Sequence, residues 1–210
     1  MAKRADFVES RRSKRRKQIF EGAVKVFAKK GYHSATTQEI ADAAGLAKGT
    51  LYEYVRDKEE ILLIVVEEGM LMVKSEIGKA ISGIDDPEER MKRAIFVQLK
   101  FAKKYRNAAK VMQHEIRNLS VDGKKRLSEL MNGQIELLRS ILDDGIKAGR
   151  FRKLDSRIAA ELFHHTSTFY FGYGDLPYQK ASLDDITKFI MDNLIHAIIK
   201  EKTKEPTPVL

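Results

Sequence analysis

Two short amphipathic segments joined by one glycine, directly after a longer amphipathic segment, restrict the fold of this chain more than any other feature. The longer segment runs from about Lys14 to Lys30 and stops at Gly31. The short segments, about Thr37–Ala44 and Ala47–Val55, flank Gly45, which can take the left-handed conformation that ends a helix. The apolar residues repeat at helical spacing and are Ile19, Phe20, Ala23, Val24, Phe27, Ala28, Ile40, Ala41, Ala44, Leu51 and Val55.

Capping signals mark where these helices begin. The run Thr36-Thr37-Gln38-Glu39 offers a threonine hydroxyl as cap and Glu39 as its capping-box partner, and Asp57-Lys58-Glu59-Glu60 opens a fourth helix to about Ile81. Two short helices joined by a tight turn predict a helix-turn-helix at about 36–55, whose second helix can enter the major groove of DNA. An ordinary helical hairpin uses the same residue types, so the pattern alone leaves both interpretations open.

Positive charge gathers at the N-terminus. Lys and Arg exceed Asp and Glu by 39 to 30, which gives a net charge of +9 and a pI near 9.5. Such a balance favours a polyanionic partner. Residues 1–12 form a basic arm, which is either a solvated tail or a phosphate-neutralising segment, and the basic residues up to position 17 are Lys3, Arg4, Arg11, Arg12, Lys14, Arg15, Arg16 and Lys17.

The composition excludes several classes of protein. The absence of cysteine excludes disulfide scaffolds, zinc fingers, thiol nucleophiles and cysteine-ligated clusters. The charged first twenty residues show no secretory signal, and the apolar run Ile61–Val66 is far shorter than the roughly 20 residues that a membrane helix needs. We therefore expect a cytoplasmic protein without a membrane partner.

The rest of the chain also favours helices. Breaks at Ser82–Pro87, Gly149–Leu154 and Gly174–Pro177 separate five further helical segments, which makes nine helices with no convincing strand. The predicted segments are about 87–105, 108–119, 122–148, 155–173 and 183–200. We expect an all-α, two-domain chain with a helix-turn-helix domain at 13–60, a second helical domain at 61–200 and a tail at 201–210.

The stretch Thr36–Leu62, together with Phe27-Ala28-Lys29-Lys30-Gly31-Tyr32, resembles the DNA-binding domain of the tetracycline-repressor (TetR) family of bacterial transcriptional regulators. The resemblance is close over residues 12–62 and rests elsewhere on length and helical habit. It implies a sequence-specific regulator bound to double-stranded operator DNA. It also implies a homodimer through the last two long helices, whose apolar residues cover more than one face; burial of these faces within a monomer is the alternative.

The resemblance assigns roles in DNA contact. Lys48, Gly49 and Thr50 would approach base edges, with Lys48 donating to guanine acceptors. Phosphates would be contacted by the hydroxyls of Thr37, Tyr52 and Tyr54 and by the ammonium of Lys58. For the two tyrosines, the alternative is that the rings pack against the protein and the hydroxyls face water. The full predicted set is Thr36, Thr37, Ala47, Lys48, Gly49, Thr50, Tyr52, Tyr54 and Lys58.

Three positions depart from the family pattern. Ala47 stands where Ser or Thr is usual, which removes a cap and a phosphate contact, and Val55 stands where Phe is common. Glu53 stands where an aromatic residue is common, and its carboxylate would repel phosphate unless it accepts from cytosine N4.

Mixed aromatic and polar residues in the second domain describe either a small-molecule pocket or ordinary core. The predicted pocket residues are Phe96, Leu99, Met112, Glu115, Phe163, Thr166, Phe169, Tyr170 and Tyr173. The segment Lys110–Leu119 is loosely similar to the acyl-CoA-responsive subgroup of the family. That similarity implies a long apolar effector, such as a fatty acyl-CoA, with an anionic head met by Lys or Arg.

Catalysis and metal binding find little support in the sequence. No nucleophile elbow occurs, and the adjacent pairs His164-His165 and His114-Glu115 have poor chelating geometry. We expect no cofactor and no enzyme activity. The favoured function is a repressor released from a palindromic operator by a small apolar or acyl-CoA-like effector; the alternatives are a non-specific DNA-binding protein without effector, a small all-helical enzyme, or an activator of the same family.

Overall fold

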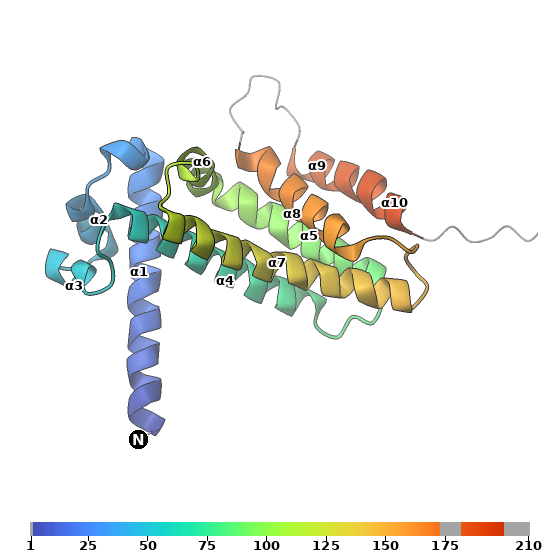
Figure 1. Cartoon of the computed structure of the whole chain (residues 1–210), viewed down its shortest axis with the longest axis horizontal. Coiled ribbons are helices and arrows are strands. Elements are labelled where there is room, and N and C mark those ends of the chain that lie inside the picture. Colours follow the sequence, from blue (N-terminus) through green and yellow to red (C-terminus); the bar gives the residue numbers. More distant parts are fainter. Residues whose placement is uncertain (1, 173–181, 200–210) are drawn as a thin grey trace, which may run out of the picture.

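The computed structural model describes residues 2–172 and 182–199, and these residues form helices with no strand beyond one isolated bridge between Phe151 and Ile199 (Figure 1). The helices are α1 (Ala2–Ser34), α2 (Thr37–Ala44), α3 (Lys48–Tyr52), α4 (Lys58–Ile81), α5 (Pro87–Lys104), α6 (Arg106–Glu115), α7 (Val121–Lys147), α8 (Ser156–Gly172), α9 (Leu183–Ile190), a π-helix η1 (Met191–Ile195) and α10 (His196–Ile198).

The all-α architecture is confirmed, while the helix count differs from the nine expected. The single helix predicted at 183–200 is divided by η1 into three labelled segments within the described residues. The first helix begins at Ala2 rather than near Lys14, so the described part of the basic arm continues α1 (Figure 1). Near its C-terminal end α1 is kinked at Gly31, which has a φ of 75° and a ψ of 174°. The third helix ends at Tyr52, earlier than the predicted Val55.

Local chemistry explains the compact N-terminal unit formed by α1, α2 and α3. The Thr36 hydroxyl accepts a hydrogen bond from the backbone nitrogen of Glu39, and the Glu39 carboxylate accepts one from the backbone nitrogen of Thr36, so the predicted capping box is present. Gly45 ends α2 at a φ of 66°. Gly22 lets α1 and α2 cross closely, because a Cβ there would lie 2.7 Å from the backbone nitrogen of Ala44. The long helix α1 also packs against α4 and α6.

Two hydrophobic cores hold the chain together. The N-terminal core centres on Ile19, Phe27, Ile40 and Leu51, and it also takes in Leu127 of α7. The C-terminal core is built from α4, α5, α7, α8 and the last helical segments, and includes Met91, Ile95, Leu99, Leu138 and Phe163. Because α4 contributes to both cores, it connects them mechanically.

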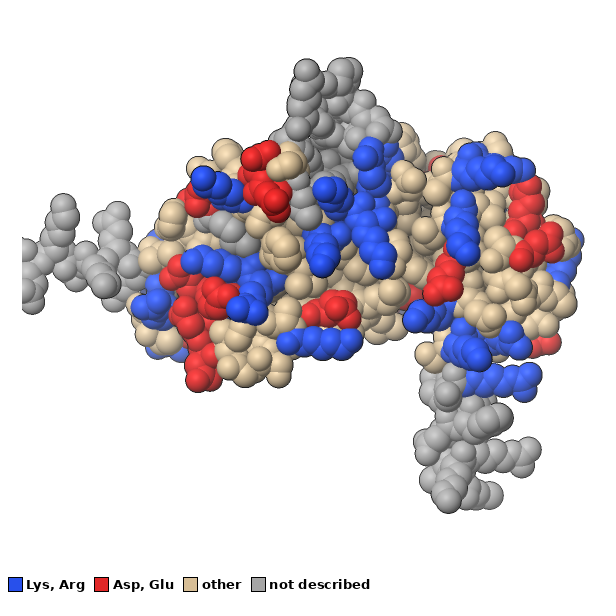
Figure 2. All heavy atoms as spheres, turned by 180° about the vertical axis from the view of Figure 1, so that it is seen from behind, with Lys and Arg blue, Asp and Glu red and all other residues tan. Residues whose placement is uncertain are grey.

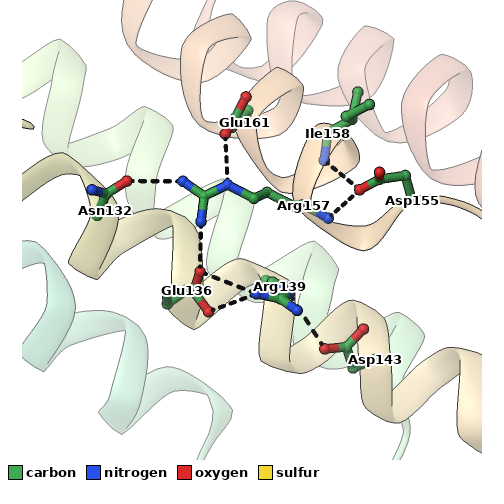
Figure 3. A network of polar contacts seen from close by, with 8 residues as sticks. All are labelled: Asn132, Glu136, Arg139, Asp143, Asp155, Arg157, Ile158 and Glu161. Carbon is green, nitrogen blue, oxygen red and sulfur yellow. Dashed lines mark hydrogen bonds and ion pairs between the residues drawn. The ribbon is translucent and has the colours of Figure 1, made fainter.

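A polar network joins α7 to the start of α8 on the surface (Figure 3). The guanidinium of Arg157 donates to Glu161, Glu136 and Asn132, at 3.1, 3.1 and 3.0 Å. Asp155 accepts from the backbone nitrogens of Arg157 and Ile158, and so caps α8. This network fixes the direction in which α8 leaves the loop.

None of the helices within the described residues is both long and apolar enough to cross a bilayer.

Candidate functional site

The start of α3 stands open to solvent at one end of the molecule (Figure 1). Lys48 and Gly49 are exposed and Thr50 is half-buried, while Leu51 is fully buried and anchors the helix in the N-terminal core. A Cβ on Gly49 would meet no atom within 4 Å, so a surface can approach the backbone here. Ala47 gives α3 no side-chain cap, which leaves its first backbone N–H groups available to a ligand.

Hydroxyl groups from α2 and α3 meet beside this end. The Thr37 hydroxyl lies 3.0 Å from the Tyr52 hydroxyl, and both side chains belong to the predicted DNA-contacting set. Tyr54 is half-buried and packs against the N-terminal core. The Thr37 hydroxyl at the start of α2 and the Tyr52 hydroxyl at the end of α3 together form a polar surface that can donate to phosphate oxygens.

Two of the predicted contact residues already have structural partners. Thr36 is engaged in the capping box with Glu39, whose pKa is lowered to about 2 by Lys30 and by the hydrogen bonds from Thr36. The ammonium of Lys58 donates to the backbone oxygens of Tyr32, His33 and Ala35, at 2.8, 3.0 and 3.2 Å. In this structure, Lys58 therefore closes the C-terminal end of α1.

A cavity of about 440 Å³ lies between α4, α5, α6, α7 and α8. Its wall is mainly apolar, with Phe20 of α1 reaching in from the N-terminal core. This volume is within the range usual for small-molecule sites. The wall residues that matter below are Val65, Gly69, Val73, Gln98, Phe101, Tyr105, Met112, Gln113, Arg117, Gln134, His164 and His165.

The structure distributes the predicted pocket residues over several environments. Met112 lies in the cavity wall. Leu99 and Phe163 belong to the C-terminal core, whereas Phe96 and Thr166 are exposed. Glu115 is buried and lies 3.1 Å from a ring nitrogen of His33 at the end of α1.

The remaining predicted pocket residues are not among the side chains that the structure describes. Phe169 and Tyr170 belong to α8 by their backbone, and Tyr173 lies outside the described residues. The face of α5 that lines the cavity was missed: it runs through Gln98, Phe101, Ala102 and Tyr105, and Leu99 faces away from it. Spacing of three and four residues could have indicated this face.

A buried polar pair interrupts the apolar wall. Nε2 of Gln98 lies 2.7 Å from Nδ1 of His164, and the two residues are 4% exposed each. Burial lowers the pKa of His164 to about 4, and the neighbouring His165 contributes to the shift. The imidazole is therefore neutral near pH 7.

Basic residues are frequent in the end of α5, in α6 and in the segment after α6, which form one side of the cavity. Between positions 100 and 117, six basic residues stand against one acidic residue, the buried Glu115. Arg117 of the cavity wall is itself exposed. Figure 2 shows Lys and Arg side chains gathered on the middle of the face opposite to that of Figure 1. The basic residues of this stretch, called the basic rim below, are Lys100, Lys103, Lys104, Arg106, Lys110 and Arg117.

Polar and charged contacts join α4 to the start of α7 and to α1. Glu59, in the first turn of α4, accepts from the backbone nitrogen of Ser120 at 3.0 Å and from its hydroxyl, at the start of α7. Gly123 makes room for this carboxylate, because a Cβ there would lie 2.6 Å from Glu59 Oε1. Glu67 of α4 pairs with both Arg16 of α1 and Arg126 of α7.

Comparisons with known proteins agree with this geometry. The family model "Bacterial regulatory proteins, tetR family" matches residues 19–65, and the model "Tetracyclin repressor-like, C-terminal domain" matches residues 84–168. The Fatty acid metabolism regulator protein of Bacillus subtilis is 31% identical over 150 residues, which cover 71% of this chain and 77% of that protein.

Solved structures give the same result. The transcriptional regulator FadR from Bacillus subtilis, solved in complex with stearoyl-CoA, superposes with a TM-score of 0.75 at 28% identity, covering 86% of this chain and 98% of that one. The fatty acid degradation regulator FadR from Bacillus halodurans gives a TM-score of 0.74 at 28% identity, covering 87% and 98%. The family consists of transcriptional regulators rather than enzymes. The exposed helix α3 in a helix-turn-helix arrangement, the helical C-terminal part of the chain and these matches together show that the chain belongs to the TetR family of DNA-binding bacterial transcriptional regulators.

Proposed function

We propose that this protein is a homodimeric repressor that leaves a palindromic operator when a long-chain acyl-CoA enters the cavity. The observation that carries this proposal is the position of α4, which begins six residues after the end of α3 and also walls the cavity through Val65, Gly69 and Val73. A ligand that moves α4 necessarily acts on the unit that carries α3. The expected coupling between the two sites is about 1–3 kcal/mol.

In this proposal, α3 reads the operator. Lys48, Gly49 and Thr50 face base edges, while Thr37, Tyr52 and Tyr54 position the unit on phosphates. The domain boundaries follow the same division: residues 13–60 bind DNA and residues 61–200 bind the effector and the second subunit. The basic arm adds phosphate contacts, and its effect should appear as a steeper dependence of affinity on salt.

The chemistry of the cavity supports an acyl thioester as effector. Its wall is mainly apolar, which suits an alkyl chain, and the basic rim suits the phosphates of coenzyme A. The relative from Bacillus subtilis was solved with stearoyl-CoA, which makes this compound the first effector to test.

Exposed apolar side chains on the last long helices support a dimer. Ile158 and Leu162 of α8 are 57% and 61% exposed, and Phe189 of α9 is 68% exposed. Large apolar side chains exposed on both helices are typical of surfaces that a second subunit covers. Twofold pairing there would present two α3 helices to half-sites about 34–36 Å apart, or a little more, and ligand-driven tilting of α4 would change that spacing. The protein would act on chromosomal DNA in the cytoplasm and catalyse no reaction.

Lys48→Ala tests the reading element. The substitution removes the cation that is expected to donate to guanine, so operator affinity should fall about tenfold or more at fixed salt. The operator is first located by footprinting the DNA that flanks the protein's own gene, and affinity is then measured by gel shift. Lys147→Ala, at the far end of α7, is the matched control and should leave affinity unchanged. Equal affinities for both variants would disprove the role given to α3.

Release by stearoyl-CoA tests the effector. Added to the protein–operator complex, stearoyl-CoA should dissociate it, whereas free coenzyme A and free stearate, which each carry only half of the chemistry, should act far more weakly. A complex that ignores all three compounds would contradict the acyl-CoA assignment.

A further inference from the structure

The buried amide of Gln98 is out of place in a cavity built for a plain alkyl chain. It lies in the part of the wall formed by α5, in a lining that also includes the apolar Phe101 and Val73, and it is 4% exposed. A buried polar group costs free energy unless a hydrogen bond compensates it. A leucine at this position would satisfy a saturated chain without that cost.

The orientation of the amide is fixed from one side. His164 of α8 is neutral because its pKa is lowered to about 4, so its Nδ1 can accept a hydrogen bond from the amide nitrogen of Gln98, 2.7 Å away. Because the amide nitrogen of Gln98 is hydrogen-bonded to His164, the amide oxygen, on the opposite side of the amide group, does not face His164. His164 therefore acts as a positioning residue for the oxygen.

The oxygen is left without a partner. Among the described residues, Oε1 of Gln98 is buried and accepts no hydrogen bond. Gln134, which lines the cavity from α7, does have a hydrogen-bond partner: its Nε2 donates to the backbone oxygen of Met70 at 2.7 Å. An unfilled acceptor in the wall of a ligand cavity calls for a donor on the ligand.

We propose that Gln98 selects effectors whose acyl chain carries a hydroxyl group, which donates to Gln98 Oε1 when the chain fills the cavity. The inference rests on the proposed function, because it concerns the same cavity and names the class of acyl chain. It adds a specificity-determining residue and a ligand chemistry that a mainly apolar wall does not by itself require.

The position of Gln98 places the hydroxyl along the chain rather than at the thioester. Gln98 lies seven residues before Tyr105, where α5 ends and α6 begins, so it is about 10 Å along the helix axis from the part of the basic rim formed by Arg106, Lys110 and Arg117. With coenzyme A held at the rim, several methylene groups separate the thioester from Gln98. The amide groups of the coenzyme A arm remain on the rim side, so they do not supply the donor.

The test compares acyl-CoAs of equal length on the full-length protein. Calorimetry measures the Kd of stearoyl-CoA and of three hydroxystearoyl-CoAs whose hydroxyl is near the thioester, in the middle of the chain, or near the methyl end. The mid-chain isomer should bind about tenfold more tightly than stearoyl-CoA, since one satisfied buried hydrogen bond contributes on that order. The same ranking should appear in the concentrations that release operator DNA.

Two variants locate the preference. Gln98→Met keeps the length of the side chain and removes the acceptor, so it should abolish the preference for the hydroxylated chain or reverse it. Gln113→Met makes the same change on α6, at a half-buried position of the same cavity, and should preserve the preference. Circular dichroism checks that both variants fold. If Gln98→Met does not fold, the comparison of acyl-CoAs on the unsubstituted protein still tests the proposal.

The outcomes separate the two proposals. If stearoyl-CoA binds as tightly as every hydroxylated isomer, or if Gln98→Met keeps the preference, the selection by Gln98 is wrong while the acyl-CoA assignment stands. If no acyl-CoA binds at all, both proposals fall. A preference for the isomer hydroxylated next to the thioester would also overturn the inference, because it would place the donor at the rim.

Discussion

Two buried glycines show how differently the two halves of this molecule, the N-terminal unit of α1–α3 and the helices around the cavity, are packed. Gly22, where α1 crosses α2, has no space beside it, since an added Cβ would lie 2.7–2.9 Å from atoms of Ala44. Gly69, in the part of α4 that walls the cavity, has space, since its added Cβ would come no closer than 3.8 Å to any neighbour. The first half is a close-packed unit that presents a helix, and the second half keeps room for a ligand.

The proposed function gives this contrast a physical basis, because it assigns a different task to each half. A reading helix is useful only if its side chains stay within a fraction of an ångström of their positions, and dense packing provides that. A ligand-responsive half needs an empty volume and buried polar groups, which both reduce its stability. We therefore expect the two halves to differ in their response to pH and to added methyl groups.

The largest expected effect concerns acid and the cavity half. The pKa of His164 is about 4 in the folded protein and near 6.5 when unfolded, so the unfolded chain binds the proton first. Stability is complete above about pH 6.5 and is lost as pH falls towards 4, by on the order of 3 kcal/mol. Urea unfolding across this pH range measures the slope.

His164→Asn is the control for that slope. It removes the titrating ring, so the loss of stability between pH 6.5 and 4.5 should flatten, because ordinary carboxylates titrate below that window. An unchanged slope in the variant would assign the effect to another group.

The next effect concerns the close-packed half. Gly22→Ala forces α1 away from the backbone of α2, and the overpacking should cost about 1–3 kcal/mol even after the helix gains from alanine. Operator affinity should fall with it, because α2 supports α3. Denaturant unfolding and gel shift check the two parts, and a more stable variant would show that the crossing is looser than described.

A smaller effect concerns the contact between the halves. Glu59→Ala removes both hydrogen bonds from the first turn of α4 to Ser120 at the start of α7. Operator affinity without effector should change little, while the release caused by stearoyl-CoA should weaken by about 1 kcal/mol, roughly fivefold. Glu129→Ala, an exposed carboxylate on α7, serves as control. If both variants respond alike, α4 and α7 communicate by another route.

The smallest effect has the opposite sign to that of Gly22→Ala. Gly69→Ala gains helix propensity and adds a methyl group where space exists, so the protein should become more stable by about 0.5–1 kcal/mol. The same methyl group narrows the cavity, and the affinity for a long acyl chain should fall slightly. Thermal melting measures the stability and calorimetry measures the affinity for acyl-CoA. A destabilised variant would contradict the expected difference in packing between Gly22 and Gly69.

The sequence predicted the N-terminal unit well because its signals are local. Thr36 and Glu39 lie three residues apart, Gly45 ends the helix it follows, and Leu51 is anchored within the same short stretch. Each of these features acts over one or two helical turns, so reading along the chain is sufficient. The resemblance to the family then gave this unit its role.

The cavity was harder to predict because its wall is assembled from distant segments. Gln98 and His164 are 66 positions apart, and no local pattern around either residue predicts that the two are in contact. Aromatic residues such as Phe96 and Phe163 were natural candidates by type, but the rotation of α5 and α8 leaves one exposed and the other in the core. The direction in which a helix turns its faces depends on every helix packed around it.

The amino-acid order by itself determined that this chain is helical, where α2 begins and ends, and that two short helices follow a longer one in a helix-turn-helix pattern, since periodicity and capping act within a few residues. Only the tertiary structure decided that Lys58 closes α1, that Glu59 reaches Ser120, and which side chains enclose empty space. Those features depend on the relative placement of α4, α5, α7 and α8, which is set by long-range packing.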